Sequence, residues 1–233
     1  MFKHNRYYQQ YYYTTKSSKQ WLTRQIRDKY VKKAAKENFR ARSAYKLQEL
    51  DNKYNFIIPN SVIIDCGASP GSWCQYISRK IFPSKKVDQD VDNNLIIAVD
   101  LLPIDPIPGV KIIQGDFTEL VTQQKIKDLL NERHVDVVLN DMAPNFTGTH
   151  FVDHVKSMDL CECSLAFAEH VLKSGGTFLC KFLMGESESD FRNKLKSKFK
   201  KVHYEKPHSS RDKSTEGYYV CLEFNKNITN GLT

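Results

Sequence analysis

The chain of 233 residues has the length of one globular domain, and its 40% hydrophobic and 12% aromatic residues are enough to form a core, which argues against disorder throughout. Its longest apolar runs have the length of strands and fall far short of the roughly 20 residues that span a bilayer. The formal net charge of +8 makes a polyanion such as nucleic acid a sensible partner.

The six cysteines show no Cys-x-x-Cys spacing, which favours free thiols in a reducing compartment. Cys161 and Cys163 resemble half of a zinc site, but no second pair of Cys or His stands at ligand spacing. We therefore expect no metal.

The N-terminal segment has a composition of its own. Residues 1–27 contain no Asp or Glu, while basic residues alternate with tyrosines and hydroxyl residues. This composition is typical of an organelle transit peptide, so we predict a targeting leader. A basic arm that binds RNA, or low-complexity sequence around YYQQYYY, is the alternative. The folded domain is then expected over residues 28–226, followed by a C-terminal tail, 227–233.

A basic helix is predicted from about Tyr30 to Asp51, because Phe39, Leu47 and Leu50 recur near helical spacing and several alanines favour a helix. Its charged face would hold RNA phosphates, although a charge run is more often only a solvated surface. The candidate RNA-binding residues on it are Lys32, Lys33, Lys36, Arg40 and Arg42.

Short apolar runs then alternate with helical stretches, which predicts an α/β fold with a doubly wound, mostly parallel sheet of seven strands. The polar segment 83–94 is expected to be a surface insertion. Strands are predicted at 62–65, 95–100, 110–113, 135–140, 177–182, 202–205 and 218–224, and helices at 72–81, 120–132, 157–173 and 187–199.

Acidic residues end the first predicted strands. Asp65 ends the first strand, Asp100 ends the second, and Asp116 follows the third. In a doubly wound sheet, ligands bind outside the carboxyl ends of the strands. A turn between Gly67 and Gly71 lets a nucleoside approach the backbone closely, and Asp100 is placed to accept hydrogen bonds from ribose hydroxyls.

The spacing of this turn bears on the ligand. A dinucleotide site needs G-x-G-x-x-G, whereas this turn is G-x-x-x-G with Pro70 inside it, and no Walker lysine follows. The turn therefore suits a nucleoside without phosphates, such as S-adenosylmethionine, rather than the cofactor of a dehydrogenase. A plain strand-to-helix turn is the alternative.

Six segments stand out in chain order, DCGASPGSWCQY, VDLLPIDPIPGV, QGDFTE, NDMAPNFTG, GGTFLCKF and KPHSSRDKSTEGYYV. In their order and spacing, the chain resembles the FtsJ-like (RrmJ-type) ribose 2′-O-methyltransferases of ribosomal RNA from about Gln20 to Phe224. The resemblance implies a Rossmann-like class I methyltransferase fold and S-adenosyl-L-methionine as the methyl donor.

Two further features resemble one branch of this family. The segment 20–50 is most similar to the mitochondrial rRNA branch. The sequence Asp141-Met-Ala-Pro144 is typical of the rRNA branch, whereas tRNA-modifying and nucleolar relatives usually have Asp-Gly-Ala-Pro. Together with the predicted leader, the resemblance implies an enzyme of the mitochondrial matrix.

The resemblance also implies a catalytic tetrad of Lys46, Asp141, Lys181 and Glu216. A ribose hydroxyl must lose its proton as it attacks a sulfonium methyl group, and a lysine can accept this proton only if its neutral form becomes accessible. We assign Lys181 as the general base, oriented by Asp141 and Glu216, with Lys46 positioning the hydroxyl. Taken singly, each residue would be an ordinary strand-end or surface charge.

For the cofactor, the resemblance implies contacts of Asp100 with the ribose, of Asp116 with the adenine amino group, and of Asp141 near the methionine end. Trp73 is alternatively a core aromatic residue, and Asp65 is alternatively a residue that only holds the turn. The turn residues implied are Gly67, Pro70, Gly71, Ser72 and Trp73.

The predicted function is S-adenosylmethionine-dependent 2′-O-methylation of a uridine ribose in large-subunit mitochondrial rRNA, with ribosomal RNA or a large-subunit precursor as partner. The alternatives are a tRNA ribose 2′-O-methyltransferase and a non-catalytic RNA-binding subunit. The latter would have lost one or more residues of the tetrad, and all four are present.

Overall fold

The computed structural model describes residues 26–82, 93–185, 188–211 and 214–226. The predicted leader lies almost wholly outside these residues, and so do the predicted tail and most of the predicted insertion at 83–94. These three assignments stay predictions. In the described part of the chain, no helix has the length and apolar character needed to cross a membrane.

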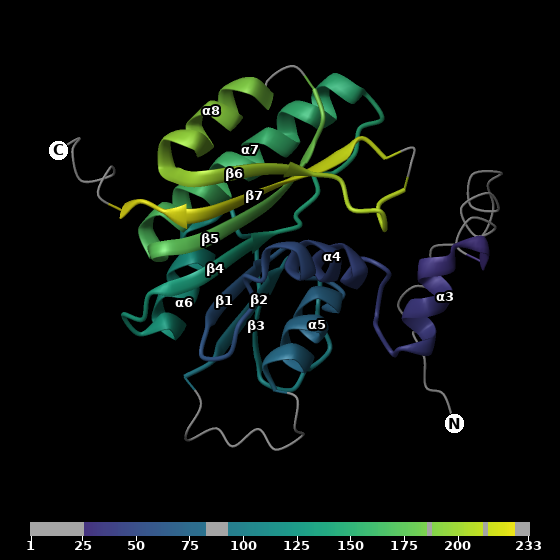
Figure 1. The fold of residues 1–233 in the computed structure, drawn as a ribbon, viewed down its shortest axis with the longest axis horizontal. Coiled ribbons are helices and arrows are strands. Elements are labelled where there is room, and N and C mark those ends of the chain that lie inside the picture. Colours follow the sequence, from purple (N-terminus) through teal and green to yellow (C-terminus); the bar gives the residue numbers. More distant parts are fainter. Residues whose placement is uncertain (1–25, 83–92, 186–187, 212–213, 227–233) are drawn as a thin grey trace.

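Seven strands form one sheet in the order β3-β2-β1-β4-β5-β7-β6 (Figure 1). Neighbours from β3 to β5 are parallel, while β7 is antiparallel to both β5 and β6. The predicted doubly wound, mostly parallel sheet is confirmed. The strands are β1 Val62–Cys66, β2 Leu95–Asp100, β3 Val110–Gln114, β4 Val135–Asn140, β5 Leu172–Leu183, β6 Phe199–Glu205 and β7 Glu216–Phe224.

Helices cover both faces of the sheet, and alternating strand residues supply the two cores. In β1, Val62 and Ile64 belong to one buried cluster, while Ile63 belongs to the other. The first cluster takes side chains from α6, α7 and α8, and the second takes them from α4 and α5. The helices are α3 Lys29–Lys36, α4 Ala44–Tyr54, α5 Ser72–Ile81, α6 Leu120–Leu130, α7 His150–Val171 and α8 Glu188–Lys198.

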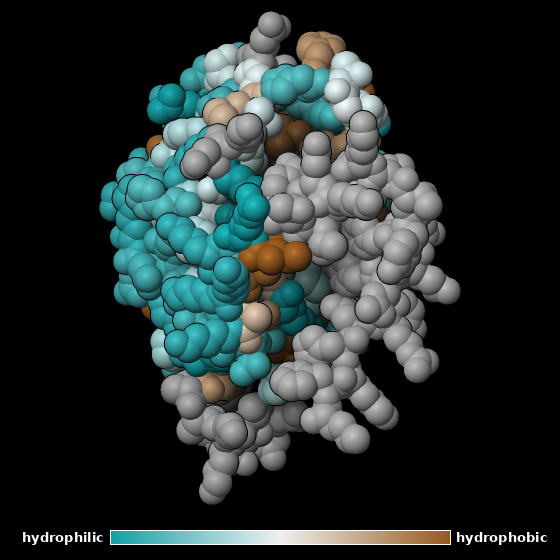
Figure 2. Space-filling model, turned by 90° about the vertical axis from the view of Figure 1, so that its right-hand side faces the viewer, coloured by the Kyte–Doolittle hydropathy of each residue, from teal (hydrophilic) through white to brown (hydrophobic). Residues whose placement is uncertain are grey.

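Helix α3 lies outside these layers, on the side that is at the right in Figure 1. Figure 2 turns that side toward the viewer, and its described surface is mainly hydrophilic, with a small group of hydrophobic residues near the middle. The basic residues Lys32, Lys33 and Lys36 are all exposed on α3.

The prediction of one basic helix from Tyr30 to Asp51 is wrong, because residues 37–43 separate α3 from α4. Asn38 adopts a left-handed φ of 56° just after α3, which ends the helix. The next residues then bond to α5 instead of continuing a helix: the Arg40 N–H donates to Gln75 Oε1 at 2.8 Å.

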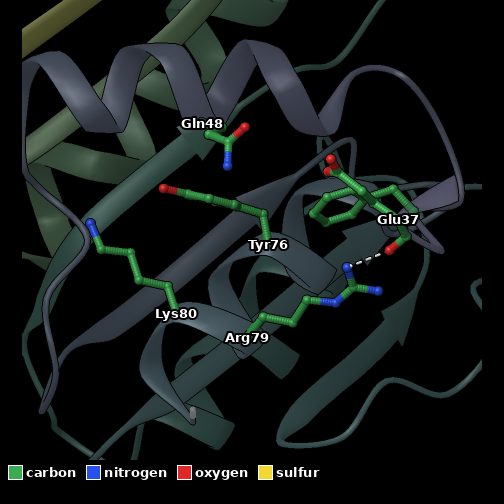
Figure 3. Close-up of a pocket in the computed structure, with 6 residues that line it drawn as sticks. Glu37, Gln48, Tyr76, Arg79 and Lys80 are labelled. Atoms are coloured by element: carbon green, nitrogen blue, oxygen red, sulfur yellow. Dashed lines mark hydrogen bonds between the residues drawn. The ribbon is translucent and has the colours of Figure 1, made fainter. Parts of the chain in front are cut away.

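Arginine side chains hold this linker in place. The Arg79 guanidinium donates to the carbonyl oxygens of Glu37 and Asn38, both at 2.8 Å, and lies 4.3 Å from the centroid of the Phe39 ring. A hollow of about 460 Å³ lies here (Figure 3), and it contains none of the predicted site residues. Its arginine takes part in holding the linker against α5, so we assign it a structural role.

Asp51 joins α4 to α5 from a fully buried position. Its side chain is 0% exposed, and it accepts hydrogen bonds from the Ile57 N–H at 2.9 Å and the Tyr76 hydroxyl at 2.7 Å, as well as from the Lys80 ammonium. Two of these donors lie on α5, and the third follows α4. One carboxylate therefore positions both helices on this face of the sheet.

We expect Asp51→Ala to lower the free energy of unfolding by about 2–4 kcal/mol, because it leaves buried donors without an acceptor. Urea unfolding measures this change. The matched control is Asp128→Ala, which removes an exposed carboxylate whose partner is Gln124 on the same helix, and should change stability by no more than about 0.5 kcal/mol. Equal effects of the two substitutions would contradict the assignment.

Candidate active site

The carboxyl ends of β1, β2 and β4 bring three acids to one edge of the sheet. Asp65 and Asp100 end or nearly end their strands, and Asp141 follows β4 directly, with its N–H donating to the Cys66 carbonyl at 2.9 Å. Asp65 is 0% exposed, and its burial, together with the nearby charges of Asp141 and Asp100, raises its pKa to about 7, although the Cys74 thiol bonded to it acts in the opposite direction.

The turn after β1 is built so that only glycine fits. Gly67 has a φ of 79°, and a Cβ there would lie 2.6 Å from the backbone nitrogen of Met142. Gly71 has a φ of 101°, and a Cβ there would lie 2.6 Å from Ile107 Cδ1. The turn therefore runs directly against the segment after β4, which carries Asp141.

Asp100 holds the turn and the next loop together. One of its carboxylate oxygens accepts from the Ser69 N–H and the other from the Leu102 N–H, both at 2.8 Å. Asp116 lies one strand further, where its Oδ1 accepts from the N–H and the hydroxyl of Thr118 at 2.8 and 2.7 Å. Both carboxylates are partly exposed at the edge where the sequence predicted them.

The first two side chains of α5, which follow the turn, contact Ser43 at the start of α4. Trp73 is 2% exposed and donates through Nε1 to the Ser43 carbonyl at 2.9 Å, and the Ser72 hydroxyl lies 2.7 Å from that of Ser43. Trp73 is thus the core aromatic residue that the sequence allowed as an alternative. Both residues fix the start of α4 to the start of α5.

The four predicted tetrad residues come together from four elements. Lys46 lies on α4, Asp141 after β4, Lys181 on β5, and Glu216 begins β7. Lys46 Nζ lies 2.6 Å from Glu216 Oε1, and Lys181 Nζ lies 3.0 Å from Asp141 Oδ1. Lys181 also donates to the Asp141 carbonyl at 2.6 Å. Two ammonium–carboxylate pairs therefore stand at this edge, largely shielded from solvent.

Tyr218 links the two pairs, and the sequence reasoning missed it. Its hydroxyl donates to Asp141 Oδ1 at 3.1 Å, and its ring centroid lies 5.7 Å from Lys46 Nζ. It stands two residues after Glu216 on the same strand, so both side chains lie on one face of β7. This spacing inside the segment STEGYYV was the available signal.

The charges in the tetrad favour an anionic Glu216 and a neutral Tyr218. Burial alone would raise the pKa of Glu216, but Lys46 and then Lys181 outweigh it and lower that pKa. Burial and the charges of Asp141 and Glu216 hold the pKa of the Tyr218 phenol well above its usual range. Tyr218 is therefore a hydrogen-bond donor to Asp141 at neutral pH.

A hollow of about 280 Å³ opens over the Lys46–Glu216 pair. Two arginines line it, Arg42 from the linker before α4 and Arg211 from the segment before β7. Arg211 was missed by the sequence reasoning, although it lies in the segment KPHSSRDKSTEGYYV. The remaining lining residues are Ala41, Ser43 and Ser214.

Asp28 anchors both arginines. Its Oδ2 accepts from Arg42 Nη1 and lies 3.7 Å from Arg211 Nε, while its Oδ1 caps α3 by accepting from the Tyr30 N–H at 2.9 Å. Burial and the charge of Arg211 lower the pKa of Arg42. One carboxylate thereby joins the basic helix α3 to the rim of the hollow.

The predicted RNA-binding residues fall into two groups. Lys32, Lys33 and Lys36 are exposed on α3, whereas Arg40 and Arg42 lie in the linker and take part in internal contacts. The Arg40 guanidinium donates to the Pro70 carbonyl at 2.9 Å. Arg40 therefore supports the glycine turn. The prediction that all five residues share one helix with Lys46 is wrong.

A sequence model of the FtsJ-like methyltransferases matches residues 39–224. The chain belongs to this family, as its motifs predicted. A protein of Wolbachia sp. subsp. Brugia malayi, named ribosomal RNA large subunit methyltransferase E, is 44% identical over 211 residues, which are 91% of each chain. A Rickettsia akari protein of the same name is 45% identical over 208 residues, which are 89% of each chain.

The solved structures include a similar protein. A Plasmodium falciparum protein described as a ribosomal RNA methyltransferase is 36% identical, with a TM-score of 0.70 over 80% of this chain and 98% of that one. The α/β methyltransferase fold is therefore shared with a crystallised relative.

The buried Asp65 predicts a pH dependence of stability. Its pKa of about 7 in the folded chain stands above the usual 3.8, so the folded state binds more protons than the unfolded state between these values. Ionisation of Asp65 then opposes folding as the pH rises through this window. Asn does not ionise, so the free energy of unfolding of Asp65→Asn should rise relative to that of the wild type as the pH rises through this window, by up to about 1.4 kcal/mol per pH unit.

Urea unfolding of both proteins at about pH 5 and about pH 7 measures this difference. Asp128→Asn, at an exposed carboxylate, is the matched control and should show no such trend. A difference between Asp65→Asn and wild type that stays constant with pH would contradict the raised pKa.

Proposed function

We propose that the protein transfers a methyl group from S-adenosyl-L-methionine to a ribose 2′-hydroxyl of large-subunit ribosomal RNA. The observation that carries this proposal is the pair of ammonium–carboxylate contacts, Lys46–Glu216 and Lys181–Asp141, joined through Tyr218 beside the glycine turn. The names of relatives that are 42–45% identical over most of the chain support the substrate class.

The residues at the sheet edge fit S-adenosylmethionine. Each Asp100 oxygen accepts one backbone N–H and keeps a lone pair for a ribose hydroxyl. Among the described residues, the buried Asp65 Oδ1 has no hydrogen-bond partner, and an ammonium group such as that of the methionine end would satisfy it. When bound, the cofactor would supply a methyl group made electrophilic by a sulfonium centre.

Lys181 is the residue that would accept the proton of the attacking hydroxyl. Asp141 fixes its ammonium group through two oxygens, at 3.0 and 2.6 Å, which sets its direction. A lysine accepts a proton only in its neutral form, so Lys181 must first release one of its own protons to solvent.

The other tetrad residues would orient the reacting groups. Lys46 Nζ lies at the hollow that Glu216 also lines, so it is placed to donate to a ribose oxygen there. Tyr218 donates to Asp141 and thereby limits the rotation of that carboxylate. Catalysis then depends on position as well as on the base, because holding a hydroxyl in line with a methyl group removes part of the barrier.

The rim of the hollow suits an RNA backbone. Arg42 and Arg211 line it, and the exposed Lys32, Lys33 and Lys36 of α3 extend positive charge away from it. Since phosphates dominate the affinity of nucleic acids for proteins, a strand bound along this side would carry a ribose toward Lys46.

We also propose that the substrate is one uridine in the peptidyl-transferase region of mitochondrial large-subunit rRNA. Two features support this narrower proposal. The acid-free composition of residues 1–27 is typical of an organelle leader, and Asp141-Met-Ala-Pro144 is typical of the rRNA branch that the chain resembles.

Replacement of Lys181 tests the chemistry. We expect Lys181→Ala to lower the rate of methyl transfer by about 100-fold or more, while S-adenosylmethionine binding stays nearly unchanged, because the lysine acts on the hydroxyl. Single-turnover transfer and calorimetry measure the two quantities. Lys173→Ala removes another β5 lysine, which is 49% exposed and pairs with Asp136, and should leave both quantities unchanged. Near-normal transfer by Lys181→Ala would refute the assignment.

Ribose methylation, mapped in mitochondrial large-subunit rRNA from cells with and without the protein, tests the substrate. We expect a single 2′-O-methyluridine to disappear in cells without it, and the Lys181→Ala protein should not restore it. A fully retained methyluridine, with loss of a methyl group from a transfer RNA ribose instead, would favour the tRNA alternative.

A further inference from the structure

A patch of exposed apolar side chains lies at the start of α7, in the segment that follows the catalytic Asp141. Phe146 is 66% exposed, Phe151 63%, Val155 37% and Val152 36%. We name these four residues the α7 patch. Phe151 and Val155 are four residues apart on one helix, so they lie on the same side of it. Large apolar side chains gathered at a surface indicate a binding site.

The segment that carries the patch is held in place by hydrogen bonds. The buried Asp153 accepts from the Thr147 N–H at 2.7 Å, the Thr147 hydroxyl at 2.8 Å and the Gly148 N–H at 3.2 Å, which ties the loop with Phe146 to the first turn of α7. The loop that carries Phe146 is therefore fixed to the turn of α7 that carries Phe151.

The first turns of α7 are also fixed to β5, the strand that carries Lys181. The His154 ring bonds through Nδ1 to the Leu183 carbonyl at 2.7 Å, and Leu183 lies two residues after Lys181 on β5. Phe146 follows Asp141 by five residues, so its Cα lies within about 18 Å of that of Asp141. Stacked nucleotides repeat every 3.4 Å or so along a strand. The patch is thus within reach of the nucleotides next to a ribose in the active site.

The charge around the patch suits a polyanion. The only carboxylate between Met142 and Lys156 is Asp153, and it is buried against the loop. His150 and Lys156 are both exposed at the two ends of the first turns of α7. A phosphate backbone would meet no exposed negative charge in this segment.

We propose that the α7 patch is a stacking platform for unpaired nucleobases of the RNA substrate, beside the methylated ribose. This inference rests on the proposed function. Aromatic rings bind unpaired bases by stacking, and proteins recognise RNA mainly through bases that are exposed in this way. A platform at this position would hold the nucleotides next to the target in an unpaired state, so that its ribose reaches Lys46 and Lys181.

The test uses the full chain and the variants Phe146→Ala, Phe151→Ala and both together. The control is Leu129→Ala, which removes an apolar side chain that is 41% exposed at the far end of α6. We expect the double variant to raise the Kd for a single-stranded oligouridylate and the KM for large-subunit rRNA by about tenfold or more. The Kd for S-adenosylmethionine and the Tm should stay at wild-type values, as should every property of Leu129→Ala.

A second variant reports on stacking directly. Phe146→Trp should keep the affinity for oligouridylate. The fluorescence that the new tryptophan adds to that of the wild type should be quenched by the single-stranded oligomer but not by a duplex of the same length. Wild-type RNA affinity in the double variant, or equal quenching by the duplex, would overturn the platform. The platform would also be overturned if the double variant lost activity on ribosomal particles but kept it on free rRNA, because this result would indicate a protein partner. If the wild type binds and stacks RNA but transfers no methyl group, the proposed function fails and the platform stands.

Discussion

Two ammonium–carboxylate pairs, Lys46–Glu216 and Lys181–Asp141, join four segments of the chain at one edge of the sheet. A charge with so little solvent contact is costly unless it is paired, so each member of these pairs depends on the correct placement of its partner. The pairing of β5 with β7 sets Lys181 opposite Tyr218. A slip of one residue would turn one of them to the other face and separate the pairs.

Most of the fold could be predicted because the central strands β1, β2 and β4 are buried on both faces and therefore read as short apolar runs, each with an acid at or next to its end. The break between α3 and α4 could not be predicted in this way. Its residues have helical propensity, but Gln75 and Arg79 of α5 bond to the linker, and these contacts exist only in the folded chain. The start of α7 was also mispredicted: the helix begins at His150 rather than near residue 157. The contact that fixes its first turn, from the Thr147 N–H to Asp153, likewise exists only in the folded chain.

The candidate site could likewise be predicted in part. The tetrad could be predicted because the resemblance implies a residue of a stated type in each of four motifs, and the structure brings all four residues together. Motif spacing says less about where a side chain points: Trp73 stands in the glycine-turn motif but lies in the core, and Arg40 supports the turn from behind. Asp28 and Arg211 were missed because each acquires its role only through a partner that is distant in the sequence.

In the proposed reaction the acceptor is a 2′-hydroxyl, which is the same on every nucleotide, so the tetrad could not by itself choose a substrate. Selectivity has to come from the surfaces around it. Asp28 offsets part of the charge of Arg42 and Arg211, so these arginines contribute less to long-range attraction than the exposed lysines of α3, and more to the position of a phosphate at the hollow. The lysines would then collect RNA, the arginines would set its register, and the α7 patch would keep the target unpaired.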